Sequence, residues 1–213
     1  RLTEYTSVIQ ELLRSAEPVS YEGRYYKVTN LKLTPPLPGG LMPGLLVSGS
    51  SEAGMQAARQ LGATAVEYPK PPAEYATASS VDGAPAPGIR IGIIARPQDA
   101  DAWNVARARY PEDRKGQLTH QLAMKVSDSA WHRQLSELGN SLPAEQNPYW
   151  LVPFQNYKAI CPFLVGSYER VADQVERYVD AGYRTFILDV PPSEEEMQHI
   201  GVVFERAVSR CAA

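Results

Sequence analysis

Few features of the sequence point to a membrane, secreted or metal-binding protein. Its 213 residues contain only two cysteines and three histidines. No apolar run approaches the roughly 20 residues that span a bilayer, so we expect no membrane association. The sequence also opens without a signal-peptide pattern, which favours a cytoplasmic protein.

The scarce cysteines and histidines also argue against a metal site. Cys161 and Cys211 lie too far apart in the sequence to form a metal-binding pair. A disulfide between them is one alternative, and two idle thiols in a reducing compartment are the other. The histidines are scattered without metal-ligand spacing: His120, His132 and His199. We expect His132 near a functional loop and His199 on the surface.

The sequence also has no large excess of positive or negative charge. The net charge is -3, with 21% charged and 44% hydrophobic residues, as in an ordinary globular domain. Proteins that bind nucleic acid or anionic membranes by electrostatics carry a basic surface. We therefore expect neither partner, and we expect residues 1–213 to bury the core of one domain.

Periodicity along the chain predicts a helix, a hairpin and then alternating strands and helices. Apolar residues recur at helical spacing over roughly Leu2–Ser15, and Val19–Leu33 alternates around Gly23 as a hairpin does. Four short apolar runs follow that suit strands of a parallel sheet. They are Gly44–Ser48, Ala63–Tyr68, Ile89–Ala95 and Thr185–Val190. This alternation indicates a parallel sheet, but not whether the sheet is doubly wound or part of an eight-stranded barrel.

The last helix is predicted to begin with a capping box, in which Ser193 and Glu196 satisfy each other's backbone N–H groups. The acidic run Glu194–Glu196 is then a solvated helix start that complements the helix dipole. An earlier helix opens at Gly166–Ser167 and ends at Gly182, as glycine ends many helices.

The segment of about residues 114–149 is more polar and less regular than its neighbours. Long insertions of this kind often act as lids, and we predict a lid over the strand ends with hinges at Gly139–Asn140 and Pro148. The alternative is a permanently packed helical hairpin whose core face carries Trp131, Leu135 and Leu138.

A glycine–serine turn offers a candidate anion site. Gly49, Ser50 and Ser51 follow a predicted strand and open a helix. Glycine lets a ligand approach the backbone closely, and the N–H groups and dipole of a helix start attract a phosphate. The plainer alternative is that Ser51 only caps the helix.

Several motifs occur in the order and spacing of a known family. They are Gly49–Gly54, Pro71–Pro72, Arg96 with Ala102–Trp103, Trp150 before Leu164–Gly166, and Gly182 with Thr185–Leu188. Together they resemble the bacterial luciferase-like flavin-dependent monooxygenases, in particular the alkanesulfonate monooxygenase-like branch. Arg1–Tyr5 resembles a helix midway along that family's chain, so the sequence matches about the C-terminal half of a member.

The resemblance implies an α/β fold of the (β/α)8 TIM-barrel type, of which this chain supplies about the C-terminal half. We therefore expect about four further βα units upstream of Arg1. It also implies reduced FMN, supplied by a separate flavin reductase, whose phosphate binds at Ser50 or Ser51. The enzyme would then use O₂ to oxidise a small organic or carrier-bound substrate. The resemblance also leads us to expect a homo-oligomer. The alternatives are an F420-dependent oxidoreductase of the same superfamily and a non-catalytic barrel subunit.

The resemblance places the site at the C-terminal ends of the strands. Those ends are Ser48–Ser51, Tyr68–Pro72, Ala95–Pro97 and Asp189–Pro191. Tyr157 stands where sulfonate-oxidising relatives have an arginine, and Pro191 stands where they have a tyrosine. Lys158, next to Tyr157, holds an anion only as a point charge, so we do not expect a sulfonate substrate.

Trp150, Tyr157 and Lys158 are the substrate-pocket candidates. Trp150 is either a pocket wall or part of the core, because a large aromatic side chain suits both places. The sequence assigns no catalytic residue, because several of the family's positions lie upstream of Arg1.

Overall fold

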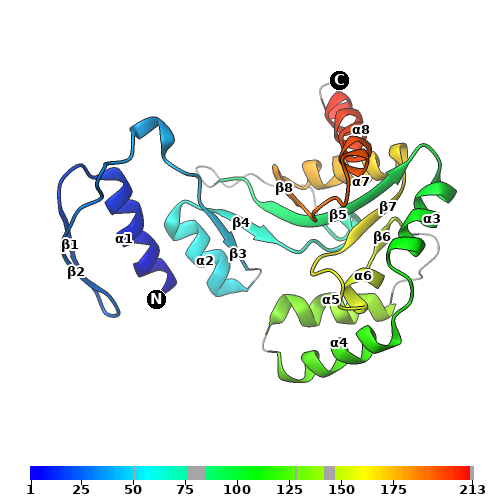
Figure 1. Cartoon of the computed structure of the whole chain (residues 1–213), viewed down its shortest axis with the longest axis horizontal. Helices are drawn as coiled ribbons and strands as arrows, with labels where there is room; N and C mark the ends of the chain where they lie inside the picture. Colours follow the sequence, from blue (N-terminus) through cyan, green and yellow to red (C-terminus); the bar gives the residue numbers. More distant parts are fainter. Residues whose placement is uncertain (50, 76–84, 128, 142–146, 212–213) are drawn as a thin grey trace. The chain divides into compact units, whose positions relative to one another are not determined.

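The computed structural model describes residues 1–49, 51–75, 85–127, 129–141 and 147–211 (Figure 1). The chain divides into two compact units. The first comprises residues 1–65 and 83–85, and the second comprises residues 66–82 and 86–213. None of the helices in the described ranges is long and apolar enough to cross a membrane.

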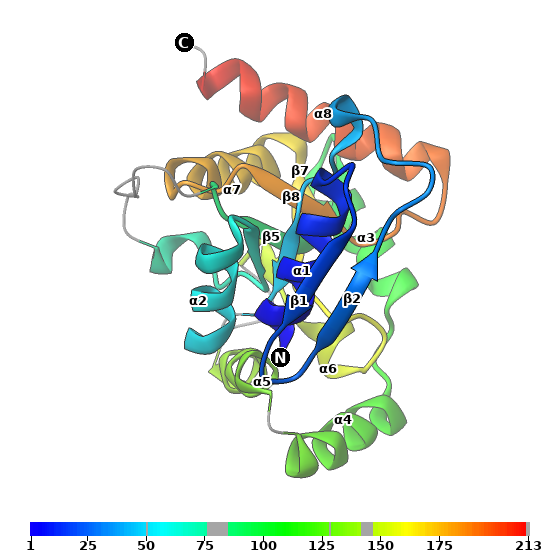
Figure 2. The same ribbon diagram turned by 90° about the vertical axis from the view of Figure 1, so that its left-hand side faces the viewer.

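The first unit holds the helix and the hairpin that the sequence predicts. Its elements are α1 (Leu2–Arg14), β1 (Val19–Glu22), β2 (Lys27–Leu31), the 3-10 turn η1 (Gly39–Leu41), β3 (Leu46–Ser48), α2 (Glu52–Leu61) and the start of β4 (Thr64–Glu67). β1 and β2 pair antiparallel, and α1 lies beside them (Figure 2). Gln10 of α1 donates a hydrogen bond to the carbonyl of Leu61, at 3.1 Å, and so joins α1 to α2. Four residues form a small core of this unit: Val47, Ala58, Leu61 and Ala63.

The second unit is an α/β structure around a parallel sheet. Its strands are the end of β4, β5 (Gly88–Arg96), β6 (Tyr149–Trp150), β7 (Phe163–Ser167) and β8 (Thr185–Leu188). Its helices are the turn η2 (Pro72–Glu74), α3 (Asp99–Arg109), α4 (Arg114–Val126), α5 (Ala130–Ser141), α6 (Val152–Gln155), α7 (Tyr168–Asp180) and α8 (Glu194–Cys211).

β5 is the long central strand of this sheet. It pairs in parallel with β4 and β8 through its first half and with β7 through Gly92–Arg96. β6 adds a short antiparallel pair to β7. In a closed barrel each strand pairs with the next parallel strand along the chain, whereas here β8 pairs with β5 instead of β7.

β7 is a strand that the sequence prediction omits, because it treats Leu164–Gly166 only as a motif before a helix. Phe163–Val165 is a short apolar run, and periodicity cannot distinguish such a run from a buried helix segment. Its pairing with β5 decides the conformation.

The two faces of β5 pack against different helices. Ile89, Ile91 and Ile93 point to the face that α7 and α8 cover, in the largest core cluster. Ile94 points to the opposite face and packs with Ala102 and Trp103 of α3. The alternation along β5 therefore places buried residues on both faces, as expected for a strand of a covered parallel sheet.

Candidate functional site

The glycine–serine turn at the start of α2 is tightly built. The hydroxyl of Ser51 accepts a hydrogen bond from the Gly54 amide at 3.2 Å, so Ser51 is the N-cap of α2. Gly49 has a φ of +153°, in a region that favours glycine. A Cβ on Gly54 would lie 3.1 Å from the Gly49 carbonyl oxygen, tighter than an ordinary contact. Ser50 lies outside the described residues.

The N-cap role of Ser51 leaves donors for an anion. The amides of Glu52 and Ala53 precede the first intrahelical hydrogen bond and therefore have no helical acceptor. The Ser51 hydroxyl accepts from Gly54 and keeps its own hydrogen to donate. The cap is thus confirmed, and phosphate binding by Gly49, Ser50 and Ser51 stays a prediction that the local geometry allows.

In the second unit, tyrosine hydroxyls hold the loop that follows β4. Tyr149 donates to the carbonyl of Pro69, and Tyr178 donates to the carbonyl of Lys70, each at 2.6 Å. The Lys70 amide donates to the hydroxyl of Tyr75 at 2.9 Å. Burial raises the pKa values of Tyr149 and Tyr178, so both stay protonated donors. The loop is therefore fixed by strands and helices distant in sequence.

This loop presents Tyr68 to the insertion. The ring of Tyr68 stacks on Trp131 of α5, with centroids 3.9 Å apart and planes 20° apart. Trp131 also contacts His132 and Phe154, the latter in α6. An aromatic surface thus lies where the end of β4 meets the insertion, at one of the predicted strand ends.

His120 and His132 lie together, contrary to the prediction that the histidines are scattered. Their ring centroids are 4.9 Å apart, because α4 and α5 form a hairpin that brings the two positions side by side. Burial lowers the pKa of both imidazoles, and the neighbouring His132 lowers that of His120 further. No cluster of His, Cys, Asp or Glu within the described ranges could hold a metal ion.

The hydrogen bonds of His120 leave one nitrogen unsatisfied. Its Nε2 lies 2.8 Å from the Ser136 hydroxyl, which donates to the His132 carbonyl. His120 Nε2 therefore carries the hydrogen, and its buried Nδ1 is an acceptor without a partner among the described atoms.

The three pocket candidates have separate surroundings. Trp150 is buried in a core cluster and lies edge-on to Trp103, with centroids 5.7 Å apart, which supports the core alternative. Tyr157 is half exposed, has a φ of +58° and lies beside His132. The ammonium of Lys158 forms an ion pair with Asp113 at 2.9 Å. Their role in a substrate pocket stays a prediction.

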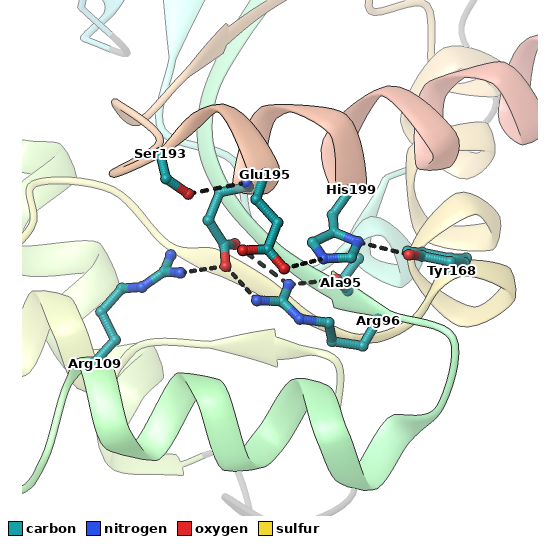
Figure 3. A network of polar contacts seen from close by, with 8 residues as sticks. Ala95, Arg96, Arg109, Tyr168, Ser193, Glu195 and His199 are labelled. Atoms are coloured by element: carbon teal, nitrogen blue, oxygen red, sulfur yellow. Dashed lines mark hydrogen bonds and ion pairs between the residues drawn. The ribbon is translucent and has the colours of Figure 1, made fainter.

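An ion-pair network joins the end of β5 to α3 and α8 (Figure 3). The carboxylate of Glu196 is paired with Arg96 and, at 2.8 Å, with Arg109. Arg96 also donates to the carbonyl of Ala95 at 2.7 Å. Burial alone would raise the pKa of Glu196, but the two guanidinium groups outweigh it and hold the pKa below its usual value.

This network corrects two predictions from the sequence. Ser193 caps α8 by accepting from the Glu196 amide at 3.2 Å, but the Glu196 side chain turns to Arg96 instead of completing the capping box. Glu196 is buried and is no part of a solvated helix start. His199 is not a surface residue either, because its Nδ1 lies 2.6 Å from the Tyr168 hydroxyl and its side chain is mostly covered.

Arg90 is a further residue that the sequence prediction did not single out. It lies on β5 with a buried Nε that has no hydrogen-bond partner among the described atoms. Its neighbours are the carboxyl group of Asp189 and the Cys161 thiol, whose pKa burial raises to about 12. Cys161 is free and protonated, as expected for an idle thiol, and the Cys211 side chain lies outside the described part.

The sequence could have indicated the buried charge of Arg90, but not that of Glu196. Arg90 interrupts an apolar strand, and a charged residue in such a place needs a partner or a ligand. The burial of Glu196 depends on Arg96, which is 100 residues away in the sequence, so no local pattern predicts it.

The first unit thus carries a glycine–serine helix start, and the second is an α/β unit with an inserted helical hairpin. Residues 1–185 match the luciferase-like monooxygenase family, and the chain belongs to that family.

One curated relative is the 4-(gamma-L-glutamylamino)butanoyl-[BtrI acyl-carrier protein] monooxygenase BtrO of Niallia circulans. It is 37% identical over 214 residues, which cover 96% of this chain and 61% of BtrO. The chain therefore spans less than two thirds of the length of this relative.

Solved structures of the same fold include the EDTA monooxygenase EmoA from Chelativorans sp. BNC1. It has a TM-score of 0.67 at 15% identity, over 98% of this chain and 58% of EmoA. The oxygenating constituent of 3,6-diketocamphane monooxygenase from Pseudomonas putida has a TM-score of 0.59 at 14% identity, over 96% of this chain and 61% of that chain. These matches confirm the luciferase-like barrel class that the sequence motifs predict, of which this chain covers somewhat more than half.

Proposed function

We propose that this chain is part of a monooxygenase that uses reduced FMN and O₂ to oxidise an acyl group attached to a carrier protein. The observation that carries the substrate class is the 37% identity to BtrO, whose name specifies a carrier-bound acyl substrate. Two departures from the sulfonate-oxidising pattern, Tyr157 and Pro191, also favour a substrate other than a sulfonate.

The cofactor assignment rests on the turn before α2. The family includes proteins that bind FMN and proteins that bind F420, and both cofactors carry phosphate. Glycine at position 54 lets the start of α2 close on the Gly49 carbonyl, since a Cβ there would lie 3.1 Å from that oxygen. Glu52 in the first turn of α2 opposes an anion, so a phosphate would be held by the amides and hydroxyls of this turn, which we call the phosphate cradle.

Bound reduced flavin would supply the activation of oxygen. The residues of this chain would hold the phosphate at Gly49–Ser51 and exclude water from the strand ends. In the second unit, the stacked Tyr68 and Trp131 cover the end of β4 with apolar surface. Reduced FMN would come from a separate flavin reductase, and the protein would act in the cytoplasm as a homo-oligomer.

Absorbance spectra distinguish the proposed cofactor from its alternatives. Purified native protein is mixed in turn with FMN, anaerobically reduced FMN and F420, and a perturbed flavin spectrum is recorded. We expect tight binding of reduced FMN and substrate-dependent product formation when O₂ is admitted. If F420 binds and neither form of FMN does, the protein would transfer hydride. If none of the three binds, the protein would be a non-catalytic subunit.

The phosphate cradle is tested by the double variant Ser50→Ala/Ser51→Ala. Hydrogen bonds to a charged group contribute about 1–3 kcal/mol, so reduced FMN should bind about tenfold or more weakly. Ser193→Ala is the matched control, because Ser193 caps α8 through an amide at the same 3.2 Å. An anaerobic titration in which both variants keep the native affinity would return Ser51 to a capping role only.

A further inference from the structure

The helix α4 presents an unusual outer face. Leu118, Leu122 and Val126 recur at i, i+4 and i+8 and have exposed fractions of 58%, 55% and 84%. Lys115 and Lys125 are exposed at the two ends of the same face. The outer face of α4 is therefore a short apolar stripe with a lysine near each end, and the two lysines lie about 15 Å apart along the helix axis, from the helical rise of 1.5 Å per residue.

The orientation of this face is fixed by contacts on the opposite side of α4. A Cβ on Gly116 would lie 2.1 Å from the backbone oxygen of Asn156, so only glycine permits this close approach. Gln117 donates to the side-chain oxygen of the buried Asn156 at 3.2 Å. His120 packs edge-on to Phe154 with centroids 4.8 Å apart. These contacts hold α4 against α6 and leave the outer face exposed.

The charge of α4 contrasts with that of the chain. Its basic residues are Arg114, Lys115 and Lys125, and the helix contains no acidic residue. The chain as a whole has a net charge of -3. An apolar stripe flanked by positive charge complements a partner whose docking surface is apolar in the middle and acidic at the rim.

A groove between α4 and α5 lies next to this face. It has a volume of about 710 Å³, and its walls include the carboxamides of Gln117, Gln121 and Gln155, the basic Lys125 and Arg133, and one acidic residue, Glu137. Lys125 belongs both to the groove and to the outer face. Carboxamides recognise the amide groups of an extended chain, and the two basic side chains suit a phosphate.

We propose that the outer face of α4 is the docking surface for an acidic carrier protein, whose phosphate-linked amide arm enters the adjoining groove. The proposal rests on the proposed function, since a carrier-bound substrate gives the enzyme a protein to recognise. A second copy of this chain is less suited to the same face, because the lysines that flank the two apolar stripes would repel each other.

The test compares the same acyl group on two carriers, a carrier protein and free pantetheine. The γ-glutamylaminobutanoyl group is attached either to a BtrI-type carrier protein or to free pantetheine, and kcat/KM of the native protein is measured on both. The variant Arg114→Glu/Lys115→Glu reverses the positive charge at one end of the docking surface and leaves the groove residue Lys125 unchanged. Lys32→Glu/Arg59→Glu is the control, with the same charge change at exposed positions outside α4.

We expect the native protein to prefer the carrier-bound group by at least about tenfold, from the size of rim-charge effects on association. The α4 variant should lose that preference through KM, with kcat/KM on the pantetheine substrate and the circular dichroism spectrum unchanged. The control should retain the preference. The docking proposal is overturned if the native protein has equal kcat/KM on the carrier-bound and pantetheine-bound groups. It is also overturned if the α4 variant and the control lose the preference equally.

Direct binding separates this proposal from the proposed function. The affinity of the carrier for immobilised native protein should fall about tenfold in the α4 variant and fall with added salt. If neither substrate is oxidised but the carrier binds through α4, the proposed chemistry is wrong and the docking surface stands. The docking proposal is overturned if the carrier does not bind. Lysine-dependent binding to vesicles of phosphatidylserine and phosphatidylcholine in place of carrier binding overturns it as well.

Discussion

Glu196 shows how one buried carboxylate connects three parts of the second unit. Its side chain is 8% exposed and pairs with Arg96 at the end of β5 and Arg109 at the end of α3. Removing one partner of a buried ion pair leaves uncompensated charge, here that of two arginines. The start of α8 is thereby held over the C-terminal end of β5, where the fold places functional loops.

The variant Glu196→Gln should therefore unfold more easily at neutral pH. We expect a loss of about 3 kcal/mol, the lower end of the range for a broken buried pair. The folded-state pKa of Glu196 lies below its usual value of 4.5, so the stabilisation is present above that value and is lost as pH falls through the folded pKa. Urea unfolding at pH 7 and below pH 4 measures this difference.

The control for this experiment is Glu195→Gln, whose side chain is 78% exposed. Surface substitutions rarely change stability by more than about 0.5 kcal/mol. If the deficit of Glu196→Gln has the same size at both pH values, the carboxylate does not act through its charge and the ion-pair explanation fails.

At the scale of elements, α4 and α5 differ in how they are attached. Leu135 of α5 is 1% exposed and belongs to the main core cluster, with Trp131 and Leu138 packed against it. This agrees with the alternative of a packed hairpin for α5. α4 contacts the unit chiefly through Gly116, Gln117 and His120, while its outer face is exposed.

Hydrogen exchange tests whether the insertion acts as a lid. Few buried contacts allow local opening, so amides of Arg114–Val126 should exchange much faster than those of Ile89–Ala95 without ligand. They should slow when flavin and substrate bind, if closure excludes water. Equal, ligand-independent protection in both segments would make the hairpin a permanent part of the fold.

Substitutions within the hairpin test the same question by stability. Leu135→Ala should destabilise the protein by about 3 kcal/mol, because it leaves a cavity in the main core. Leu122→Ala, on the outer face of α4, should change the free energy of unfolding by less than about 0.5 kcal/mol. Similar values for the two variants in urea unfolding would mean that α5 is not anchored as its contacts indicate.

The sequence predicts elements better than it predicts their contacts. The helix α1 and the strand β5 follow from the pattern of apolar residues, which depends on neighbouring residues alone. β7 is missed because its run of apolar residues is short and its partner is β5. The pairing of His120 with His132 requires the hairpin turn, and the burial of Glu196 requires Arg96.

At the scale of the whole molecule, both compact units contribute to the family match and to the features of the candidate site. The glycine–serine turn belongs to the first unit, while Tyr68, Trp131 and the ion-pair network belong to the second. Residues 1–185 match the family, so both units contribute to the match. The chain covers 61% of BtrO, and the activity of the whole protein is therefore a proposal.

The proposed partnership with a reductase gives a prediction for the whole protein. Photoreduced FMN should support oxidation of the carrier-bound substrate without any reductase, since the flavin would be delivered by diffusion. NADH with FMN should support it only after a flavin reductase is added. Product formation from NADH and FMN alone, measured by mass spectrometry of the acyl group, would show that the protein reduces its own flavin.

The stack of Tyr68 on Trp131 also makes the insertion visible to fluorescence. The chain has three tryptophans, and Trp103 and Trp150 lie buried against each other in a separate cluster. Replacing those two by phenylalanine would leave Trp131 as the single indole emitter, in contact with the loop after β4. Its emission maximum and its quenching by iodide would then report, in real time, any separation of α5 from that loop.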